Sequence, residues 1–534
     1  ETVLPITGGT VSLDAGSWPH VSSSLSVGLP TDAEAAAFLS ALDPRESPRV
    51  EVWHQIGDAV PRVYDLGLRE RPLALASGEL TLTLASDEAL LDDVRTLVDD
   101  PEPATYQTSL RAVCDYVLGR VVPGAALEPQ PAIDRDVSAY WQVMNLVTNP
   151  SAEVNATGYT VGGGTSSVSR VAGGYSGSWC VQWMSSGAGW SYVDMTGFVT
   201  KPDVSYVASS YVRMSAARPV RMMLRFHDAG GRIIVVVPGE IVSVPASTWT
   251  RVHVTTVAPP GSASCSVHVV QEATGSGQAA MVDAVMLHEG TEPVPYFDGA
   301  SPADASYTYS WANDAHASTS DRAPVSERLP ESLVWHAGDS ATEFLMGLVQ
   351  SVGLRLVCDE QRRWTLRDES YVAPGVVEIR YGVNMLDTTD TISRDDDGWC
   401  DGAVVIYTWA GEDGTQQRRV DAWSLIPQPQ KVVKVERSMP FPGVGFAEYI
   451  VRRAQGRGRR FSGRRVTDGA EQAEQPVTIV MPAQDVQLGF TNKVTLDLAT
   501  DEVTIDARTR DTPDGAIDLL AGTIDALVGT IDEL

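Results

Sequence analysis

The stretch between Asn145 and Gly299 constrains the fold more than any other part of the sequence. It consists of short segments in which apolar and polar residues alternate, separated by turns rich in glycine and proline. A period of two places every second side chain on one face of a β-strand. Many short strands joined by tight turns are typical of a β-sandwich or jelly roll. We therefore predict one β-domain over residues 145–300, with its clearest strands at Ser178–Trp183, Tyr206–Met214, Arg221–Phe226, Trp249–Val254 and Ser266–Val270.

Helical periodicity flanks this stretch on both sides. Apolar residues at helical spacing occur over residues 108–119, and again over 340–352 after a capping box of Ser340 and Glu343. Because insertions are tolerated at exposed connections, we predict a mainly β scaffold with a few helices that the β-domain interrupts. The predicted parts are a first scaffold part (1–144), the insert (145–300), a linker (301–330), a second scaffold part (331–510) and a C-terminal heptad segment (511–534).

Length and charge narrow the functional classes. A chain of 534 residues is too long for a single core. Its 40 basic and 69 acidic residues give a net charge of −29, which disfavours a general affinity for nucleic acid or for an anionic membrane. No signal peptide and no run of 18 apolar residues is visible, and the five cysteines are scattered. We expect no membrane span, no specific nucleic-acid partner and folding in a reducing cytoplasm.

Catalytic motifs are not visible in the sequence. It contains no His-Glu-x-x-His pair and no Gly-x-Ser-x-Gly elbow. A glycosidase requires two carboxylates about 5–10 Å apart, but a chain with 69 acidic residues supplies such candidates by chance. We therefore expect a protein that is not an enzyme.

Four short motifs in the insert resemble the carbohydrate-binding modules of the family 4/9/22 type. They are the opening Asn149-Pro150-Ser151-Ala152-Glu153, the Gly177-Ser178 step, the Trp249-Thr250-Arg251 step and the late strand Met281-Val282-Asp283-Ala284. The resemblance implies a jelly roll with a structural Ca²⁺ held by Glu153 and Asp283, because carboxylate oxygens suit this hard cation. The family usually has Phe where Ala152 stands. The alternative is that Glu153 and Asp283 are surface acids of an acidic protein.

Five residues of the insert are predicted to bind carbohydrate. Trp190 and Tyr192 follow Gly187-Ala188-Gly189, where exposed rings could stack on a sugar. The resemblance adds Tyr211, Arg213 and Arg225, from strands that line the concave face of the resembled modules. The alternative is that these are ordinary residues of a sandwich.

The flanks of the insert resemble minor tail proteins of long-tailed phages that infect actinobacteria. The resemblance rests on Asp43-Pro44-Arg45, on Trp335 before the capped helix, on Gly353–Glu360, on Tyr296–Gly299 and on Ala315–Ser320. It implies a tail-tip or baseplate hub with β-barrel domains, located at the tail tip of the virion and assembled in the cytoplasm of the bacterial host. The implied partners are the distal tail protein, the tape measure, the fibres and, through the insert, a host cell-wall glycan.

Assembly as a homotrimer follows from the same resemblance, since a hub closes around the tail axis. The heptad seam of Ile517, Leu520, Ile524, Leu527, Ile531 and Leu534 alone would favour a dimer. Gly522 and Gly529 each weaken a helix by about 1 kcal/mol, so the seam needs partners to form. The alternative to a tail hub is a secreted glycan-binding protein or a cell-wall-degrading enzyme that carries a carbohydrate-binding module.

Overall fold

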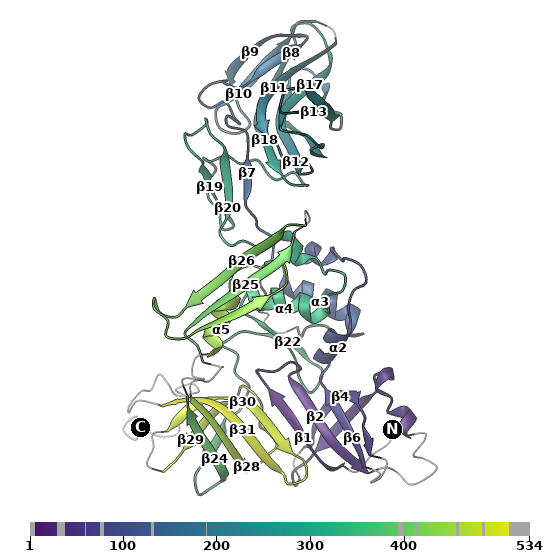
Figure 1. Cartoon of the computed structure of the whole chain (residues 1–534), viewed down its shortest axis with the longest axis vertical. Coiled ribbons are helices and arrows are strands. Elements are labelled where there is room, and N and C mark those ends of the chain that lie inside the picture. Colours follow the sequence, from purple (N-terminus) through teal and green to yellow (C-terminus); the bar gives the residue numbers. More distant parts are fainter. Residues whose placement is uncertain are drawn as a thin grey trace. The chain divides into compact units, whose positions relative to one another are not determined.

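The computed structural model describes residues 6–28, 38–58, 60–74, 79–129, 133–187, 189–393, 399–411, 414–454, 459–482 and 486–511. The chain divides into two compact units (Figure 1). Unit 1 consists of Glu1–Ala139 and Arg328–Leu534, and unit 2 is Tyr140–Glu327. The prediction of a mainly β chain with a few helices and an inserted sandwich is confirmed. The predicted heptad segment, apart from Asp511, lies outside the described residues.

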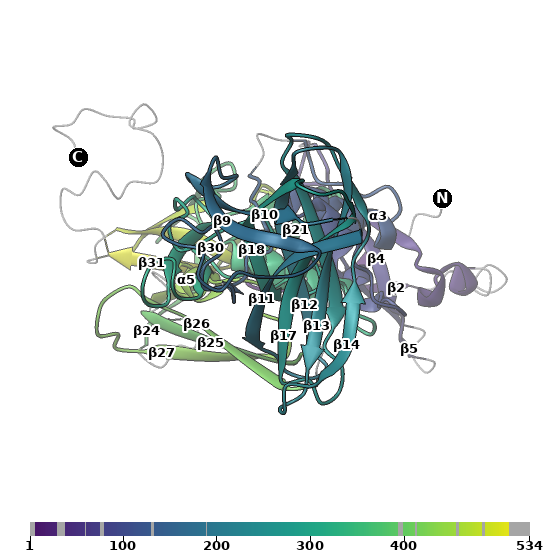
Figure 2. The ribbon, with the colours of Figure 1, turned by 90° about the horizontal axis from the view of Figure 1, so that it is seen from above.

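Unit 2 is built on two antiparallel sheets. The first has the strand order β16-β12-β18-β10-β9, and the second has the order β14-β13-β17-β11-β8, with β15 also paired to β13. Figure 2 shows β14, β13 and β17 of the second sheet side by side. The strands of the first sheet are β9 (Thr165–Ala172), β10 (Trp179–Ser185), β12 (Ser205–Met214), β16 (Thr250–Val257) and β18 (Ala279–Glu289). Those of the second are β8 (Thr160–Gly163), β11 (Gly189–Val199), β13 (Arg218–His227), β14 (Ile233–Pro238), β15 (Val242–Val244) and β17 (Ser264–Thr274).

Alternate residues of both sheets form one core in unit 2. Val181 and Trp183 of β10 are fully buried, as are Met222 and Leu224 of β13. The indole Nε1 of Trp183 donates to Ser191 Oγ at 3.2 Å, which satisfies its only polar atom. Because side chains alternate across a strand, the intervening residues of each strand must lie on the outer faces of the sandwich.

Residues 301–330, which were expected to form a linker, contain two strands. They contain β19 (Tyr307–Trp311) and β20 (Ser320–Pro324), which form a three-stranded sheet with β7 (Val143–Asn145). Arg322 is 5% exposed, and its guanidinium lies 4.2 Å from the ring centroid of Tyr307 and 5.6 Å from that of Phe297. In this sheet β7, where the chain enters unit 2, pairs with β20, where the chain leaves it. The paired residues are 175 or more positions apart in the sequence, so local sequence patterns cannot predict the pairing.

One sheet of unit 1 contains strands from the first part and from the last part of the chain. In its twelve-stranded sheet, β1 (Ile6–Asp14) pairs with β30 (Gln487–Asp497). Among the described residues the pairing order runs from β24 to β3 without closing on itself, so the barrel expected from the hub resemblance is an open sheet here. The other strands are β2 (Val21–Gly28), β3 (Arg49–His54), β4 (Arg62–Glu70), β5 (Leu73–Ala74), β6 (Glu79–Ala85), β23 (Val377–Arg380), β24 (Met385–Ile392), β28 (Arg459–Val466), β29 (Pro476–Val480) and β31 (Glu502–Asp511).

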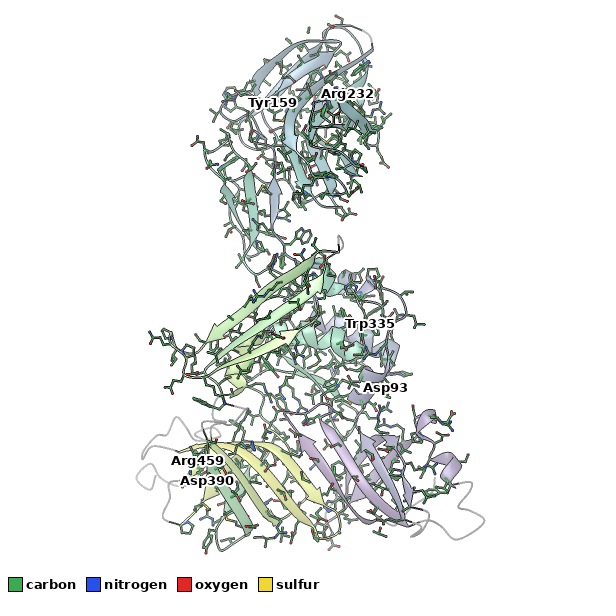
Figure 3. The ribbon with its side chains drawn as sticks, viewed as in Figure 1. Asp93, Tyr159, Arg232, Trp335, Asp390 and Arg459 are labelled. Atoms are coloured by element: carbon green, nitrogen blue, oxygen red, sulfur yellow. The ribbon has the colours of Figure 1, made fainter. Side chains whose placement is uncertain are left out.

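Ion pairs between neighbouring strands stabilise this sheet, and unit 1 also contains helices. Asp390 of β24 and Arg459 of β28 form an ion pair at 2.6 Å (Figure 3). The two predicted helices are α3 and α4, and the predicted capping box is present, with Glu343 N donating to Ser340 Oγ at 3.1 Å. The remaining elements are α2 (Glu88–Asp93), α3 (Leu110–Val121), α4 (Ala341–Ser351), α5 (Phe446–Ala454), η1 (Pro44–Glu46), η2 (Glu102–Tyr106), η3 (Pro330–Leu333), β21 (Arg355–Cys358), β22 (Trp364–Arg367), β25 (Gly402–Ala410), β26 (Gln416–Ser424) and β27 (Val432–Arg437).

Within the described part of the chain, no helix has both the length and the apolar character needed to cross a membrane.

Candidate functional site

The outer face of the six-stranded sheet gathers aromatic and charged side chains. In β11, Val193 and Met195 enter the core, so Trp190, Tyr192 and Asp194 lie on the opposite face. The strand pairing places Tyr192 opposite Val270 of β17 and Val270 opposite Arg221 of β13. We call the outward residues of these three strands the β11–β13 face; its members are Trp190, Tyr192, Asp194, Arg221, Met223, Arg225, Ser266, His268, Val270 and Glu272.

Trp190 and Tyr192 form an aromatic platform on this face. Their ring centroids are 5.2 Å apart and their planes are inclined by 14°, and Trp190 is 48% exposed. The neighbouring strand makes room for them, because a Cβ at Gly162 of β8 would collide with the hydroxyl of Tyr192. The sequence alone identifies the glycines at 162–164 only as part of a turn-rich segment between strands. Their position beside an outward aromatic residue is the signal that could have revealed this fit.

The polar groups of the β11–β13 face differ in their pairing. Arg221 Nε lies 2.5 Å from Glu272 Oε1 in an ion pair, and Asp194 Oδ1 accepts from Thr160 Oγ1 at 2.7 Å. The side chain of Arg225, by contrast, makes no hydrogen bond or ion pair with any described residue, and its Nε is buried. The positive charge of Arg225 is therefore available to a ligand. Sequence reasoning missed Asp194, Arg221 and Glu272, although their outward parity on alternating strands could have indicated them.

His268 lies at the centre of this face. It is fully buried, its Nε2 is 2.9 Å from Ser266 Oγ, and its ring centroid is 5.2 Å from that of Tyr192. Burial, followed by the positive charge of Arg225, lowers the pKa of His268 to about 4. The imidazole is therefore neutral near pH 7 and can both donate and accept hydrogen bonds.

Tyr211 and Arg213 lie on the outer face of the other sheet. Their neighbour Val212 is in the core, so both point outward from β12. The Tyr211 ring stacks on Tyr175 with centroids 3.6 Å apart, and the Arg213 guanidinium lies 4.7 Å from the ring centroid of Trp249. The five residues predicted to bind sugar thus form two separate sets, Trp190, Tyr192 and Arg225 on one sheet and Tyr211 and Arg213 on the other.

Glu153 and Asp283, the predicted calcium ligands, accept hydrogen bonds from backbone N–H groups at opposite ends of the loop between β9 and β10. Asp283 Oδ2 accepts from Tyr175 N at 2.6 Å and from Ser176 N at 3.0 Å. Glu153 Oε1 accepts from Ser178 N and Trp179 N, both at 2.9 Å. Asp283 is fully buried, and burial, together with the negative charge of Glu153, raises its pKa to about 7.

These two carboxylates fit a calcium ion in part. Ca²⁺ takes six to eight oxygen ligands, and no group of three or more His, Cys, Asp or Glu gathers at one point among the described residues. Ala152 and Ala284, next to the two acids, both have positive φ values (54° and 53°), a conformation that costs about 1–3 kcal/mol and often occurs at ligand sites. Glu153 and Asp283 are the residues that would hold the ion, and both carboxylates accept hydrogen bonds from backbone N–H groups.

Comparison with known proteins gives partial likenesses. No protein-family model matches the chain, and no curated protein matches it. An enzymatically active domain of bacteriophage CBA120 tailspike protein 4 is 17% identical over 27% of this chain and 21% of that chain, with a TM-score of 0.24. The CBM22-1 xylan-binding domain of Paenibacillus barcinonensis Xyn10C is 16% identical over 29% of this chain and 100% of that chain, with a TM-score of 0.24.

A third likeness is the C-terminal family 22 carbohydrate-binding module of Clostridium thermocellum Xyn10B. It is 15% identical over 27% of this chain and 94% of that chain, with a TM-score of 0.23. At these scores the likenesses establish neither an activity nor a ligand for this chain.

Proposed function

We propose that unit 2 is a glycan-binding module and that its sugar site is the β11–β13 face. The observation that carries this proposal is the stacked pair of Trp190 and Tyr192 on an outer sheet face, which also carries the guanidinium of Arg225 opposite Ser266 of β17. Sugar sites combine aromatic platforms, which stack on the apolar face of a ring, with a few polar groups that fix its orientation. Asp194, two residues beyond Tyr192 on β11 and partly exposed, supplies such a polar group on the same face.

The rings of the other sheet are a weaker candidate. Tyr175 covers one face of Tyr211, and Arg213 covers one face of Trp249. Tyr175 belongs to the loop whose backbone Asp283 holds. The stacking on Tyr175 gives Tyr211 a role in holding that loop, and Trp249 covers the guanidinium of Arg213, so we assign sugar binding to the β11–β13 face.

For the whole chain we propose a non-enzymatic structural role as a tail-tip hub of a phage particle, with unit 2 contacting a host cell-wall glycan during adsorption. The proposal is supported by the resemblance of the flanks and by a scaffold whose two halves share one sheet through β1 and β30. In a homotrimer, three weak sites would act together by effective concentration. The competing function is a secreted glycan-binding protein or a cell-wall-degrading enzyme.

Retention on host cell walls tests the glycan proposal. The full chain is incubated with purified walls, with and without competing soluble wall polysaccharide, and the bound fraction is measured. We expect retention that the polysaccharide abolishes. Absence of retention on every wall fraction would contradict the proposal.

Two further measurements test the structural role. Mass spectrometry of purified virions should find the chain in the particle, and light scattering should give about three chains per assembly. Absence from the particle would favour the secreted alternative, and a strict monomer at micromolar concentration would count against the trimer.

A further inference from the structure

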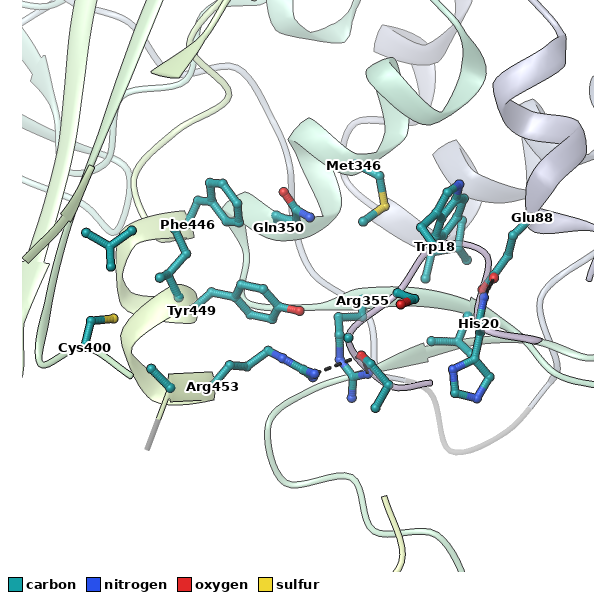
Figure 4. A pocket seen from close by; sticks show the side chains of 18 residues that line it. Trp18, His20, Glu88, Met346, Gln350, Arg355, Cys400, Phe446, Tyr449 and Arg453 are labelled. Carbon is teal, nitrogen blue, oxygen red and sulfur yellow. Dashed lines mark hydrogen bonds between the residues drawn. The ribbon is translucent and has the colours of Figure 1, made fainter. Parts of the chain in front are cut away.

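The cavity of unit 1 shown in Figure 4 is lined in part by side chains that hold the unit together. It has a volume of about 330 Å³, and its walls come from α4, from α5, from the residues that follow β1 and from β21. On this wall Arg453 donates to the carbonyl of Ala15 at 2.9 Å, and Arg355 forms a buried ion pair with Glu474. Arg355 and Arg453 therefore contribute to the packing of unit 1.

Strand β14 forms an exposed apolar edge of unit 2. It lies at one end of the order β14-β13-β17-β11-β8, and Figure 2 shows it beside β13. Its first four residues, Ile233, Ile234, Val235 and Val236, are all apolar and are 55, 40, 37 and 39% exposed. Exposed apolar edge strands are sites at which proteins associate with further strands.

The outer side of β14 also has backbone groups available for pairing. Gly239 N donates to Met222 O at 2.8 Å, so the backbone at Gly239 faces β13. Backbone groups of an antiparallel strand alternate between its two sides. The N–H and C=O of Val236 and the C=O of Pro238 therefore face away from β13, on the side where the described part of the chain has no further strand. Pro238 has no N–H, and at an edge strand this loses no bond within the sheet.

The charges that flank β14 are self-complementary. Arg232 precedes the strand and Glu240 follows it, both are exposed, and residues 233–239 between them are uncharged. Neither side chain forms an ion pair with any residue that the structure describes. Val236 lies midway between them, so an antiparallel pairing centred on Val236 places Arg232 of each copy opposite Glu240 of the other. A parallel pairing in register would place like charges next to each other, which is unfavourable.

We propose that unit 2 associates with a second copy of itself through β14. The two strands pair antiparallel, and the N–H and C=O of Val236 exchange two hydrogen bonds with the same groups of the second copy. The apolar side chains along the edge are removed from water, and ion pairs between Arg232 and Glu240 form at both ends. A contact along one strand is smaller than the roughly 1,200–2,000 Å² of a stable interface, so the association is weak and depends on concentration.

This pairing would bring two sugar sites onto one surface. The twofold axis of an antiparallel pair is perpendicular to the sheet, so the outer faces of both copies point to the same side. Two β11–β13 faces could then bind two points of one polymer, which strengthens retention by effective concentration. This consequence rests on the proposed sugar site, whereas the strand pairing does not. A twofold contact joins two copies, so it adds to the threefold contact of the proposed trimer.

Disulfide trapping in the full chain tests the pairing. The five cysteines of the chain are buried, and Val236→Cys adds an exposed one. Residues of a hydrogen-bonded antiparallel pair have Cα atoms about 5.5 Å apart, within the usual range for a disulfide of about 4.4–6.8 Å. Under mild oxidation we expect Val236→Cys to form covalent dimer at least tenfold faster than Val257→Cys, a 54% exposed position on β16, the edge strand of the other sheet. Equal rates would overturn the proposal.

Charge reversal tests the antiparallel arrangement. In the Val236→Cys chain, Arg232→Glu places like charges at both ends of the pair and should slow dimer formation at least threefold. Addition of Glu240→Arg makes the charges opposite again and should restore the rate. Both effects should fade at high salt, because exposed charges are screened. A rate that neither change alters would overturn the arrangement and with it the proposal.

The reactivity of the Val236→Cys thiol distinguishes other occupants of the edge. A thiol that forms no dimer but is protected from a maleimide would mean that another part of the chain or a different protein covers β14, which would overturn the proposal. Dimer formation without retention on cell walls would support the pairing and count against the sugar site alone. Retention on walls without dimer formation would count against the pairing alone.

Discussion

Tyr192 occupies the space that a side chain at Gly162 would fill. The two residues are cross-strand partners of β11 and β8, and a Cβ on Gly162 would collide with the Tyr192 hydroxyl. We predict that Gly162→Ala displaces the ring from Trp190 and lowers retention on host cell walls by tenfold or more. The control is Gly187→Ala, because a Cβ there meets no atom within 4 Å. Equal retention of the two variants would show that the position of Tyr192 does not matter for binding.

Removal of the platform itself should abolish binding with little effect on folding. Trp190 is half exposed, and truncations of exposed side chains usually change stability by less than about 0.5 kcal/mol. We predict that Trp190→Ala with Tyr192→Ala abolishes wall retention and leaves Tm nearly unchanged. Tyr211→Ala is the matched control on the opposite sheet. Loss of binding in the control alone would move the site to that sheet, and loss of folding in the double variant would make both rings structural.

The sequence allowed the faces of the strands to be predicted, but not the sheets to which the strands belong. Val181 and Trp183 are in the core, and Tyr192 and Arg225 are outward, as a period of two requires. Tyr211 has the same outward parity and still lies on the other sheet, because strand order depends on pairing between distant segments.

Long-range contacts also explain why the strands within residues 301–330 and the ion pairs around Glu474 could not be predicted from the sequence. β20 pairs with β7, so residues 301–330 could not be recognised as structured from their local composition. The ion pairs around Glu474 come from β21, β22, α5 and the segment before β29, and no motif with fixed spacing marks them. The capping box of α4 was predictable because all of its atoms lie within four consecutive residues.

Calcium should stabilise unit 2 if Glu153 and Asp283 hold an ion. The two acids bind opposite ends of the loop between β9 and β10, and a cation between them would neutralise their mutual repulsion. We predict that millimolar Ca²⁺ raises Tm relative to chelator by several degrees, and that Glu153→Gln or Asp283→Asn removes the difference. Mg²⁺ serves as the control because it requires a tighter octahedral shell. Identical Tm values for the unmodified chain in Ca²⁺ and in chelator would exclude the ion.

Glu88 should make the stability of unit 1 depend on pH. Its pKa is raised from 4.5 to about 7 by burial, so the folded state keeps a proton that the unfolded chain loses above pH 4.5. The stability that this proton contributes is lost as the pH rises from about 4.5 to about 7. A shift of this size corresponds to roughly 3 kcal/mol.

A glutamine at this position removes the titration. We predict that Glu88→Gln gains free energy of unfolding relative to the unmodified chain as the pH rises from 4.5 to 8, measured by urea denaturation at each pH. His20 contributes with the opposite sign, because its pKa is lowered to about 4, but it is present in both proteins. A difference between Glu88→Gln and the unmodified chain that is constant with pH would show that Glu88 does not titrate in this range.

Unit 2 should fold alone when the fragment includes the strands at both of its ends. Its core is formed by its own two sheets, and the pairing of Val143 with Arg322 brings its first and last segments together. A fragment of residues 140–327 should therefore unfold cooperatively in urea. The shorter fragment 145–300 lacks Val143, β19 and β20 and uncovers Phe297, which is 1% exposed in the intact unit.

Loss of contacts of this size should lower the free energy of unfolding by roughly 2 kcal/mol, since the burial of one large apolar side chain contributes about 1.5–3 kcal/mol. Circular dichroism in urea compares the two fragments directly. A common midpoint would mean that the three-stranded sheet adds nothing to the sandwich. An unfolded 140–327 fragment would mean that unit 2 depends on unit 1 for its structure.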